Sequence, residues 1–371
     1  MMRTLVISDL HLGAANGTDL LRRAELRAPL VEALKGVDRL VILGDALELR
    51  EMPVRAATAA AADLLGEAGA ALGPEGEIVL AGGNHDHALV APWIAARLQQ
   101  AGPATLGLAH DIAPEEAGPL AVALAERARP ARLRLAYPGL WLRDDVYAIH
   151  GHYSDLHTTV PTFERLAAGA MGRWVAPLPV ADATPDDYEA CLAPLYAWMH
   201  VLAERADEGV VKAGAGASAR AWVALSGRST RSPRALAVGL GYRGAIRAIN
   251  RSGIGPVRPE LSGAALRQGG LHGMGEALRR LGIRAPHVIW GHSHRAGPFP
   301  GDDECEWTAP TGSRLHNTGS WVYQRHFLPG GPNESPYWPG AAVLVEDEGA
   351  PRLMRLLGER GHAELAPAAR G

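Results

Sequence analysis

Seven short segments rich in Val, Ile and Leu constrain the fold of this chain more than any other feature. Each of them ends in polar residues or glycine, which is the pattern of buried strands in a layered α/β protein. The predicted strands are Arg3–Ser8, Arg39–Leu43, Glu77–Ala81, Asp145–Ile149, His287–Trp290, Arg314–Thr318 and Ala341–Glu346. Amphipathic patterns predict helices from Thr18 or Asp19 to Leu34, over Val54–Leu72 and over Pro92–Gln100. The sequence therefore predicts the α/β class.

Two long intervals interrupt this alternation, and the length of 371 residues exceeds that of one ordinary domain. We interpret residues 101–140 as a small insertion with one helix over Glu115–Arg132. Residues 155–285 are predicted to form a mostly helical insertion, which we call the cap. The core then comprises residues 1–154 and 286–357, in which Pro351–Leu357 suits a last strand. Residues 358–371 are predicted to form a flexible tail.

The composition excludes several classes of protein. The chain is 47% hydrophobic and 21% charged with a mean hydropathy of -0.04, which is ordinary for a globular protein and unlike a disordered or multi-span membrane protein. The N-terminal apolar run is too short for a signal peptide, and no stretch reaches the roughly 20 apolar residues of a spanning helix. The two cysteines, Cys191 and Cys305, favour free thiols over a single disulfide. We therefore expect a cytoplasmic protein.

Five of the predicted strands end in residue types that bind metal ions. The clusters are DLH at 9–11, GDALE at 44–48, GNHD at 83–86, HGH at 150–152 and GHSH at 291–294. Each alone is compatible with ordinary turn and capping chemistry, but the carboxyl ends of strands in an open α/β sheet meet in one crevice. Carboxylate, imidazole and amide groups suit divalent Mn, Fe, Zn, Ni or Co. A carboxylate such as Asp45 has two oxygens and can bridge two ions, so the pattern favours a site for two metals.

In this order the five motifs resemble the calcineurin-like metallophosphoesterase superfamily, whose fold is a layered β-sandwich flanked by helices. The resemblance spans residues 9–294 and implies two divalent ions, with Mn favoured, and attack of a metal-bridging hydroxide on a phosphate ester. One implied ligand set is Asp9, His11, Asp45 and His294. The other is Asp45, Asn84, His150 and His292, with Asp45 shared between the ions.

The resemblance also suggests roles for residues beside the ligands. His85 falls where the family has an imidazole that contacts the phosphoryl group or protonates the leaving oxygen, with Asp86 or Glu48 as the acid that orients it. His150 is preferred to His152 as a ligand because it directly follows an apolar strand. His152 remains open as a second-shell donor, a substrate contact or an exposed loop residue.

The cap carries a concentration of positive charge. Lys and Arg total 37, of which only two are lysines, and residues 209–284 contain twelve arginines and Lys212 against only two glutamates. Arg243, Arg247 and Arg251 recur every fourth residue, which puts them on one face of a helix. This face is either a solvated surface or a surface that binds an anionic small molecule or a lipid head group. A pI near 6.6 and few aromatic residues in this block disfavour nucleic acid, whereas peripheral contact with a membrane remains open.

The motifs predict a dimetal phosphoesterase, without deciding between monoester, diester and pyrophosphate substrates. The alternative is a nucleotide-lipid or nucleotide-sugar pyrophosphatase similar to UDP-diacylglucosamine pyrophosphatase, suggested by DLHLG, GHSHRA and the basic helical insertion. This chain has His85 and His152 where that subfamily typically has arginine and aspartate. A nuclease is less favoured because no appended DNA-binding segment is visible. A non-catalytic scaffold is less favoured because all the implied ligands are present.

Overall fold

The centre of the molecule is one large sheet, seen here in a computed structural model that describes all residues except 1, 206–232, 261, 329, 333 and 368–371. Within the described residues the sheet has ten strands in the order β10-β9-β1-β2-β3-β5-β6-β7-β8, with β4 paired to β5 beside this path. The strands are β1 (Thr4–Ile7), β2 (Arg39–Leu43), β3 (Glu77–Ala81), β4 (Ala109–Ile112), β5 (Arg132–Arg143), β6 (Val146–Ile149), β7 (His287–Trp290), β8 (Arg314–Asn317), β9 (Ala341–Val345) and β10 (Arg352–Arg355).

Helices occupy both sides of the sheet, and short 3-10 turns follow several strands. The helices are α1 (Ala24–Leu34), α2 (Val54–Leu72), α3 (Ala91–Leu98), α4 (Pro114–Ala117), α5 (Pro119–Arg127), α6 (Phe163–Trp174), α7 (Pro185–Arg205), α10 (Pro233–Arg251), α11 (Gly263–Arg280) and α12 (His362–Leu365). The 3-10 turns are η1 (Leu20–Arg22), η2 (His87–Leu89), η3 (His152–Leu156), η4 (Glu304–Trp307) and η5 (Arg325–Phe327). None of the described helices combines the length and apolar composition needed to cross a membrane.

Strand β5 joins two parallel halves of the sheet. Residues 132–136 of β5 pair in parallel with β3, which continues the parallel order β1, β2, β3. Residues 139–143 of the same strand pair antiparallel with β6, which is followed by β7 and β8 in parallel. Because one long strand belongs to both halves, the sheet is continuous. It bends where β5 passes from one half to the other, and we call this bend the corner.

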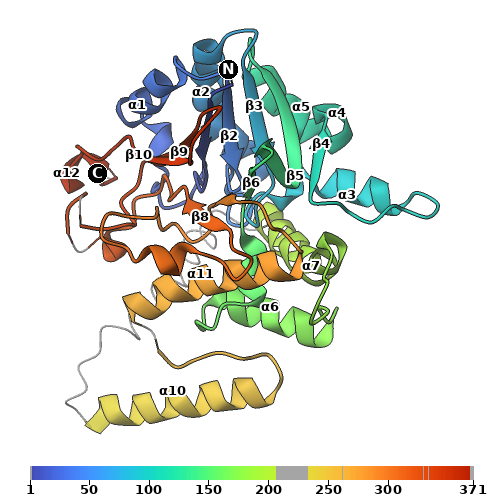
Figure 1. Cartoon of the computed structure of the whole chain (residues 1–371), viewed down its shortest axis with the longest axis vertical. Coiled ribbons are helices and arrows are strands. Elements are labelled where there is room, and N and C mark those ends of the chain that lie inside the picture. Colours follow the sequence, from blue (N-terminus) through green and yellow to red (C-terminus); the bar gives the residue numbers. More distant parts are fainter. Residues whose placement is uncertain (1, 206–232, 261, 329, 333, 368–371) are drawn as a thin grey trace.

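The two halves of the sheet pack against each other. One buried apolar cluster consists of strand residues from both halves, such as Val6, Val41, Val79, Val146 and Ile289. Since no helix residue belongs to this cluster, each half must be covering the face of the other. Helices α1, α2, α3 and α5 cover the outer face of the half that contains β1–β3, and α6, α7 and α11 cover the outer face of the half that contains β6–β8. In Figure 1, α1, α2 and α5 lie around the upper part of the sheet, whereas α6, α7 and α11 lie below it. The molecule is therefore a layered α/β protein.

All seven predicted strands are present, and the α/β class is confirmed. Three of the strands, and the helix over Val54–Leu72, have the predicted bounds. The helix predicted from Thr18 or Asp19 begins instead at Ala24 after η1, because the Asp19 carboxylate accepts from the backbone N–H of Gly13 at 2.8 Å and pairs with Arg22 rather than capping a helix.

The interpretation of residues 101–140 as an insertion with one helix is wrong. This interval contains β4, two short helices and most of β5, which lies inside the sheet. Strand β5 was not predicted because Arg132, Arg134 and Pro138 interrupt its apolar pattern. Arg134 is nevertheless accommodated at the surface, where its Nε donates to Glu77 at 2.9 Å.

Part of the predicted tail packs against the core. Residues 362–365 form α12, and Leu365 is fully buried in the same apolar cluster as α1 and α2. The imidazole of His362 lies 2.9 Å from the hydroxyl of Tyr323 and 2.9 Å from the carbonyl of Gly330. Strand β10 falls within the predicted last strand, and residues 368–371 lie outside the described residues. Cys191 and Cys305 are free thiols.

The described part of the cap contains the helices α6, α7, α10 and α11, joined by irregular segments. Helices α6, α7 and α11 supply the outer layer of one half of the sheet, whereas α10 extends away from that layer (Figure 1). The segment after α10 returns to the other cap helices, where Arg173 Nε donates to the carbonyl of Ser252 at 3.3 Å. Residues 206–232, which include Trp222 and part of the basic block, lie outside the described residues.

Candidate metal centre

The loops that follow β1, β2, β3, β6 and β7 converge on one point between the two halves of the sheet. The backbone N–H of His292 donates to Asp9 Oδ2 at 2.9 Å, which joins the loop after β7 to the loop after β1. His150 Nδ1 lies 2.8 Å from the carbonyl oxygen of Leu43, which joins the end of β6 to the end of β2. The expected convergence of strand ends is therefore observed, and it draws on both halves of the sheet.

The backbone at this point has an unusual conformation. Six non-glycine residues among those described have positive φ, and five of them are predicted ligands, namely Asp9, His11, Asp45, His292 and His294, with φ between 46° and 62°. Positive φ is uncommon for residues with a side chain, and such strain accumulates where function requires a particular side-chain direction. The conformation supports the interpretation of these loops as a site.

The first ligand cluster contains Asp9, His11 and His294, whose candidate ligand atoms lie within 4.8 Å of one another. His294 Nε2 is 3.3 Å from Asp9 Oδ1, and His11 Nε2 is 3.2 Å from His294 Nε2. Two imidazole nitrogens at this separation repel each other unless a proton or a cation lies between them. The fourth predicted ligand, Asp45, places Oδ2 3.8 Å from His11 Nε2.

The second ligand cluster contains Asp45, His150 and His292, and Asn84 lies beside it. His150 Nε2 is 3.3 Å from Asp45 Oδ2. The Asn84 amide has two possible orientations. In one, Oδ1 faces His150 Nε2 at 3.2 Å and His292 Nδ1 at 3.1 Å, and all of these atoms are acceptors when the imidazoles are neutral. In the other, Nδ2 donates to the same atoms and Oδ1 accepts from Arg50 Nη1 at 2.8 Å. The first orientation is favourable when a cation lies among the acceptors.

The donor set fits a pair of divalent cations. Buried and half-buried carboxylate, imidazole and amide groups form the clusters, and Asp45 Oδ2 faces both of them. The other oxygen of Asp45 accepts from the backbone N–H of His85 at 2.8 Å, which fixes the carboxylate. Asp45 therefore lies where a ligand shared by two ions is predicted to lie.

The buried carboxylates of the clusters also favour the binding of positive charge. Burial by itself would lower the pKa of both His11 and His150. Hydrogen bonding to Glu48 and the charge of Asp45 raise the pKa of His11 to about 9. The charge of Asp45 and a hydrogen bond to it raise the pKa of His150 to about 10. Burial would raise the pKa of Asp45, yet the charges of His150 and His85 hold it well below its usual value. The carboxylates thus retain protons on the imidazoles. A divalent cation can take the place of those protons, because metal ligation by histidine requires the neutral ring.

Hydrogen bonds at the far nitrogens fix the direction of three of the histidines. Glu48 Oε2 accepts from His11 Nδ1 at 3.0 Å, and Asp155 Oδ1 accepts from His292 Nε2 at 2.8 Å. The Leu43 carbonyl does the same for His150. These contacts leave His11 Nε2, His150 Nε2 and His292 Nδ1 facing the clusters, which is the usual support of metal-binding imidazoles. Asp155 lies in η3, and no spacing in the sequence had singled it out.

His85 is oriented by Glu48 and not by Asp86. Its Nδ1 lies 2.8 Å from Glu48 Oε2, and its Nε2 lies 3.1 Å from Arg50 Nη1. Burial lowers the pKa of His85 in spite of the neighbouring Glu48 charge. The Nε2 atom is therefore the one that can accept or donate a proton at the open side of the centre.

The role of orienting acid that was predicted for Asp86 is wrong. The fully buried Asp86 carboxylate accepts from the backbone N–H groups of Gly83 at 2.7 Å, Ala46 at 2.7 Å, Asp45 at 3.2 Å and Leu47 at 3.3 Å. These four bonds use both carboxylate oxygens and tie the loop after β3 to the loop after β2. Asp86 therefore positions Asp45 and does not touch the His85 ring.

The predicted substrate contacts lie in two different places. His152 is buried with its ring centroid 5.6 Å from that of His150, and within the described residues neither of its ring nitrogens has a hydrogen-bond partner. Arg243, Arg247 and Arg251 are exposed on α10, which Figure 1 shows apart from the strand ends. The chain after α10 contacts the segment before α6, where the N–H of Arg258 donates to the Thr159 carbonyl at 2.7 Å.

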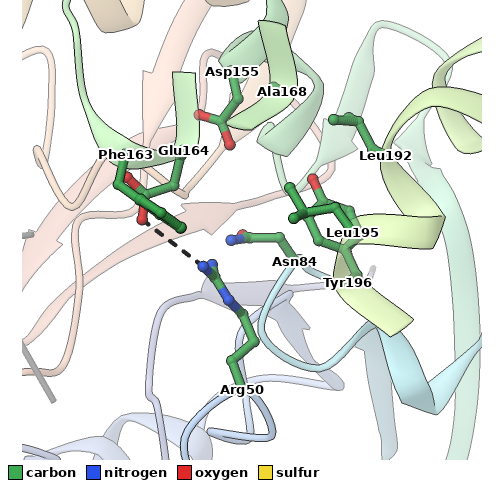
Figure 2. A pocket seen from close by; sticks show the side chains of 9 residues that line it. All are labelled: Arg50, Asn84, Asp155, Phe163, Glu164, Ala168, Leu192, Leu195 and Tyr196. Carbon is green, nitrogen blue, oxygen red and sulfur yellow. Dashed lines mark ion pairs between the residues drawn. The ribbon is translucent and has the colours of Figure 1, made fainter. Parts of the chain in front are cut away.

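A small pocket opens beside the second cluster (Figure 2). It has a volume of about 10 Å³, which is room for about one water molecule. Its lining residues are Arg50, Asn84, Asp155, Phe163, Glu164, Ala168, Leu192, Leu195 and Tyr196. Helices α6 and α7 of the cap supply six of these residues, so the cap does form one wall of the site. Sequence reasoning missed Arg50 and Tyr196, because Arg50 stands beyond the end of the GDALE motif and Tyr196 belongs to a long amphipathic helix.

Comparison with known proteins finds no family model that matches the chain and no curated protein that matches it. The function must therefore be inferred from the chemistry of the centre.

Proposed function

We propose that this protein is a dimetal-dependent hydrolase of phosphate esters with the calcineurin-like metallophosphoesterase fold. The observation that carries the proposal is the pair of buried ligand clusters that share Asp45 and lie next to His85. The continuous layered sheet and the convergence of five strand ends support the fold assignment.

The residues of the two clusters would hold one ion each. Asp9, His11, Asp45 and His294 form the first set, and Asp45, Asn84, His150 and His292 form the second. When bound, such ions acidify water and neutralise the charge of phosphoryl oxygens. We favour Mn, with Fe, Zn, Ni and Co as the other candidates, because the set mixes oxygen and nitrogen donors and contains no thiolate.

His85 would serve as the proton donor to the leaving oxygen. Glu48 accepts from Nδ1, which holds the ring in one orientation and makes Nε2 the reactive nitrogen. Nε2 faces the side on which Arg50 and the pocket lie. A positioned imidazole of this kind contributes on the order of 10²- to 10⁴-fold to a rate.

The alternative is a pyrophosphatase that acts on a nucleotide-linked lipid or sugar. The apolar side chains of Phe163, Leu192 and Leu195 in the pocket favour it, and so does the exposure of Trp174 and Trp198 on the two cap helices that form the pocket wall. Exposed aromatic side chains on such helices suit contact with a lipid surface. Peripheral membrane contact remains a prediction.

Hydrolysis of bis-p-nitrophenyl phosphate and p-nitrophenyl phosphate by metal-stripped protein, titrated with Mn²⁺ and other divalent ions, tests the proposal. We expect metal-dependent turnover that is abolished in Asp45→Asn and falls about 10²-fold or more in His85→Ala. His272→Ala, at an exposed position on α11, is the control and should retain full turnover. If bound metal supports no turnover of these esters, nucleotide-lipid pyrophosphates are tested next. Failure there as well would contradict hydrolysis and favour a non-catalytic binding protein.

A further inference from the structure

Arg50 is a buried charge that the metal ligands do not use. Its side chain is only 7% exposed, and the acid that approaches it, Glu164 on α6, places Oε1 3.9 Å from Nη2. Within the described part of the chain its Nε has no hydrogen-bond partner. A buried guanidinium group with so weak a counterion is costly unless a ligand supplies a negative charge.

The guanidinium group of Arg50 points at the reactive side of the centre. Nη1 lies 3.1 Å from His85 Nε2 and 2.8 Å from the amide of Asn84. In Figure 2 the group lies beside Asn84 at the middle of the pocket, with the dashed line marking its long ion pair to Glu164. Arg50 therefore lies between the predicted proton donor and the second ligand cluster.

A second unpartnered donor lines the same pocket. Tyr196 on α7 is 5% exposed, and its hydroxyl has no hydrogen-bond partner among the described residues. Buried hydroxyl and guanidinium groups are normally satisfied. Two donors without partners that line one pocket indicate that a polar ligand binds there and accepts hydrogen bonds from both.

The Asn84 amide identifies the character of that ligand. When Oδ1 faces the second cluster, as a metal ligand must, Nδ2 faces Arg50 Nη1, and both groups are donors. Two donors so close together require a shared acceptor, and a negatively charged oxygen is the strongest one.

We propose that Arg50 and Tyr196, together with the amide of Asn84, form the subsite that binds the non-bridging oxygens of a phosphate group. This inference rests on the proposed metal centre and deepens it, because it assigns the residues that would hold the phosphoryl group of an ester beside His85. Glu164 occupies the place of the anion in the ligand-free protein. Being 30% exposed and on the first turn of α6, it can turn to solvent when phosphate binds.

Calorimetric titration of inorganic phosphate into the Mn²⁺-loaded protein tests the subsite without relying on turnover. We expect the Kd for phosphate to rise on the order of 10- to 100-fold in Arg50→Gln and several-fold in Tyr196→Phe, as for the loss of hydrogen bonds to a charged group. Arg50→Lys should give an intermediate Kd, because it keeps the charge but loses the planar fork. Glu164→Gln should bind phosphate as tightly as the wild type or more tightly. Mn²⁺ stoichiometry and affinity should be unchanged in all four variants.

Two matched controls separate the subsite from general effects. Arg173→Gln changes an exposed arginine on α6, and Tyr188→Phe changes a buried tyrosine on α7 whose hydroxyl lies 2.7 Å from His157 Nε2. Both should keep the wild-type Kd for phosphate. If Arg50→Gln fails to fold, Arg50→Lys and Tyr196→Phe decide the question.

The possible outcomes distinguish this inference from the proposed function. An unchanged Kd for phosphate in folded Arg50 variants overturns the subsite, even if the wild type hydrolyses esters. A loss of Mn²⁺ binding in Arg50→Gln also overturns it, since Arg50 would then support the metal centre instead. If the wild type binds phosphate through Arg50 and hydrolyses no ester or pyrophosphate, the subsite stands and the proposed function fails.

Discussion

At the scale of single residues, the geometry of the centre depends on which ring nitrogen of each histidine is hydrogen-bonded to a supporting carboxylate. Glu48 holds His11 at Nδ1, whereas Asp155 holds His292 at Nε2, so the two rings present different nitrogens to the clusters. A carboxylate behind a metal-binding imidazole fixes its orientation and raises its basicity. Each carboxylate therefore supports a different cluster.

This division predicts that the two clusters can be weakened one at a time. Glu48→Gln should weaken binding at the cluster of His11, and Asp155→Asn should weaken binding at the cluster of His292, each by about 10- to 100-fold in metal affinity. Calorimetric titration of the stripped protein with Mn²⁺ measures both steps, and each variant is the control for the other. If both substitutions weakened the same step, or neither weakened any, the assignment of two clusters would be wrong.

The convergence of the candidate ligands could be predicted from sequence, but the residues that hydrogen-bond to them could not. Asp9, His11, Asp45 and His150 follow apolar strands directly, so the topology alone brings them together. Asp155 and Arg50 reach the centre from loop positions that no periodicity marks. Asp86 shows a second limit of the sequence analysis. The GNHD motif places Asp86 next to His85, but it does not show whether the carboxylate contacts the His85 ring or backbone N–H groups.

At the scale of elements, one buried carboxylate joins the cap to the core. Glu189 on α7 accepts from the hydroxyls of Tyr137 and Tyr153, the latter at 2.7 Å, and its Oε2 lies 2.8 Å from His87 Nε2. Its partners belong to β5, η3 and η2. This network holds α7, which supplies Leu192, Leu195 and Tyr196 to the pocket, in a fixed place.

Removal of this carboxylate should loosen the cap. Glu189→Ala leaves two buried hydroxyls and an imidazole without their shared partner, and we expect a loss of about 3–5 kcal/mol in the free energy of unfolding. Urea denaturation measures the loss, and hydrogen exchange should show faster exchange in α7. Arg205→Ala, at an exposed position of the same helix, is the control and should cost less than about 1 kcal/mol. Equal effects of the two substitutions would contradict the role of the network.

A buried histidine at the same junction predicts a pH dependence of stability. His157 Nε2 lies 2.7 Å from the hydroxyl of Tyr188, and burial, assisted by the charge of Arg280, lowers its pKa from 6.5 to about 3. Between these two pH values the unfolded chain binds a proton that the folded chain does not, so stability falls as the pH falls from 6.5 toward 3.

We expect His157→Gln to reduce this slope by about 1.4 kcal/mol per pH unit. Free energies of unfolding of the wild type and the variant, measured from pH 6.5 down to pH 4.5, give the difference in slope. His272→Gln, at an exposed position of α11, controls for the loss of a histidine. Parallel curves for the wild type and His157→Gln would show that His157 is charged in the folded protein.

Apolar strands and a well-patterned helix such as α2 could be predicted closely, because each buries a continuous or periodic face. Strand β5 could not, since half of it pairs with β3 and half with β6. Arg132 and Arg134 interrupt the apolar pattern of the first half, and Pro138 lies between the halves. Helix α12 is too short to show a period, and it is held by the burial of Leu365 rather than by its own pattern.

At the scale of the whole molecule, the candidate metal centre lies where the two halves of the sheet meet. The first cluster joins residues after β1 to His294 after β7, and the second joins Asp45 after β2 to His150 after β6. Each cluster thus contains ligands from both halves. This arrangement follows from the corner in β5, which no local sequence pattern reveals.

Metal binding should therefore stabilise the molecule as a whole. An ion that binds only the folded chain adds about 2.7 kcal/mol to the free energy of unfolding when its concentration is 100 times Kd. We expect Mn²⁺ to raise the Tm of chelator-treated protein, and Asp45→Asn, which alters the ligand shared by both clusters, to lose most of this rise. Asp63→Asn, a substitution at a carboxylate that is 74% exposed on α2, should keep it in full. Equal rises in Tm for all three proteins would mean that Mn²⁺ binds elsewhere, and that the two halves of the sheet are held together without the metal.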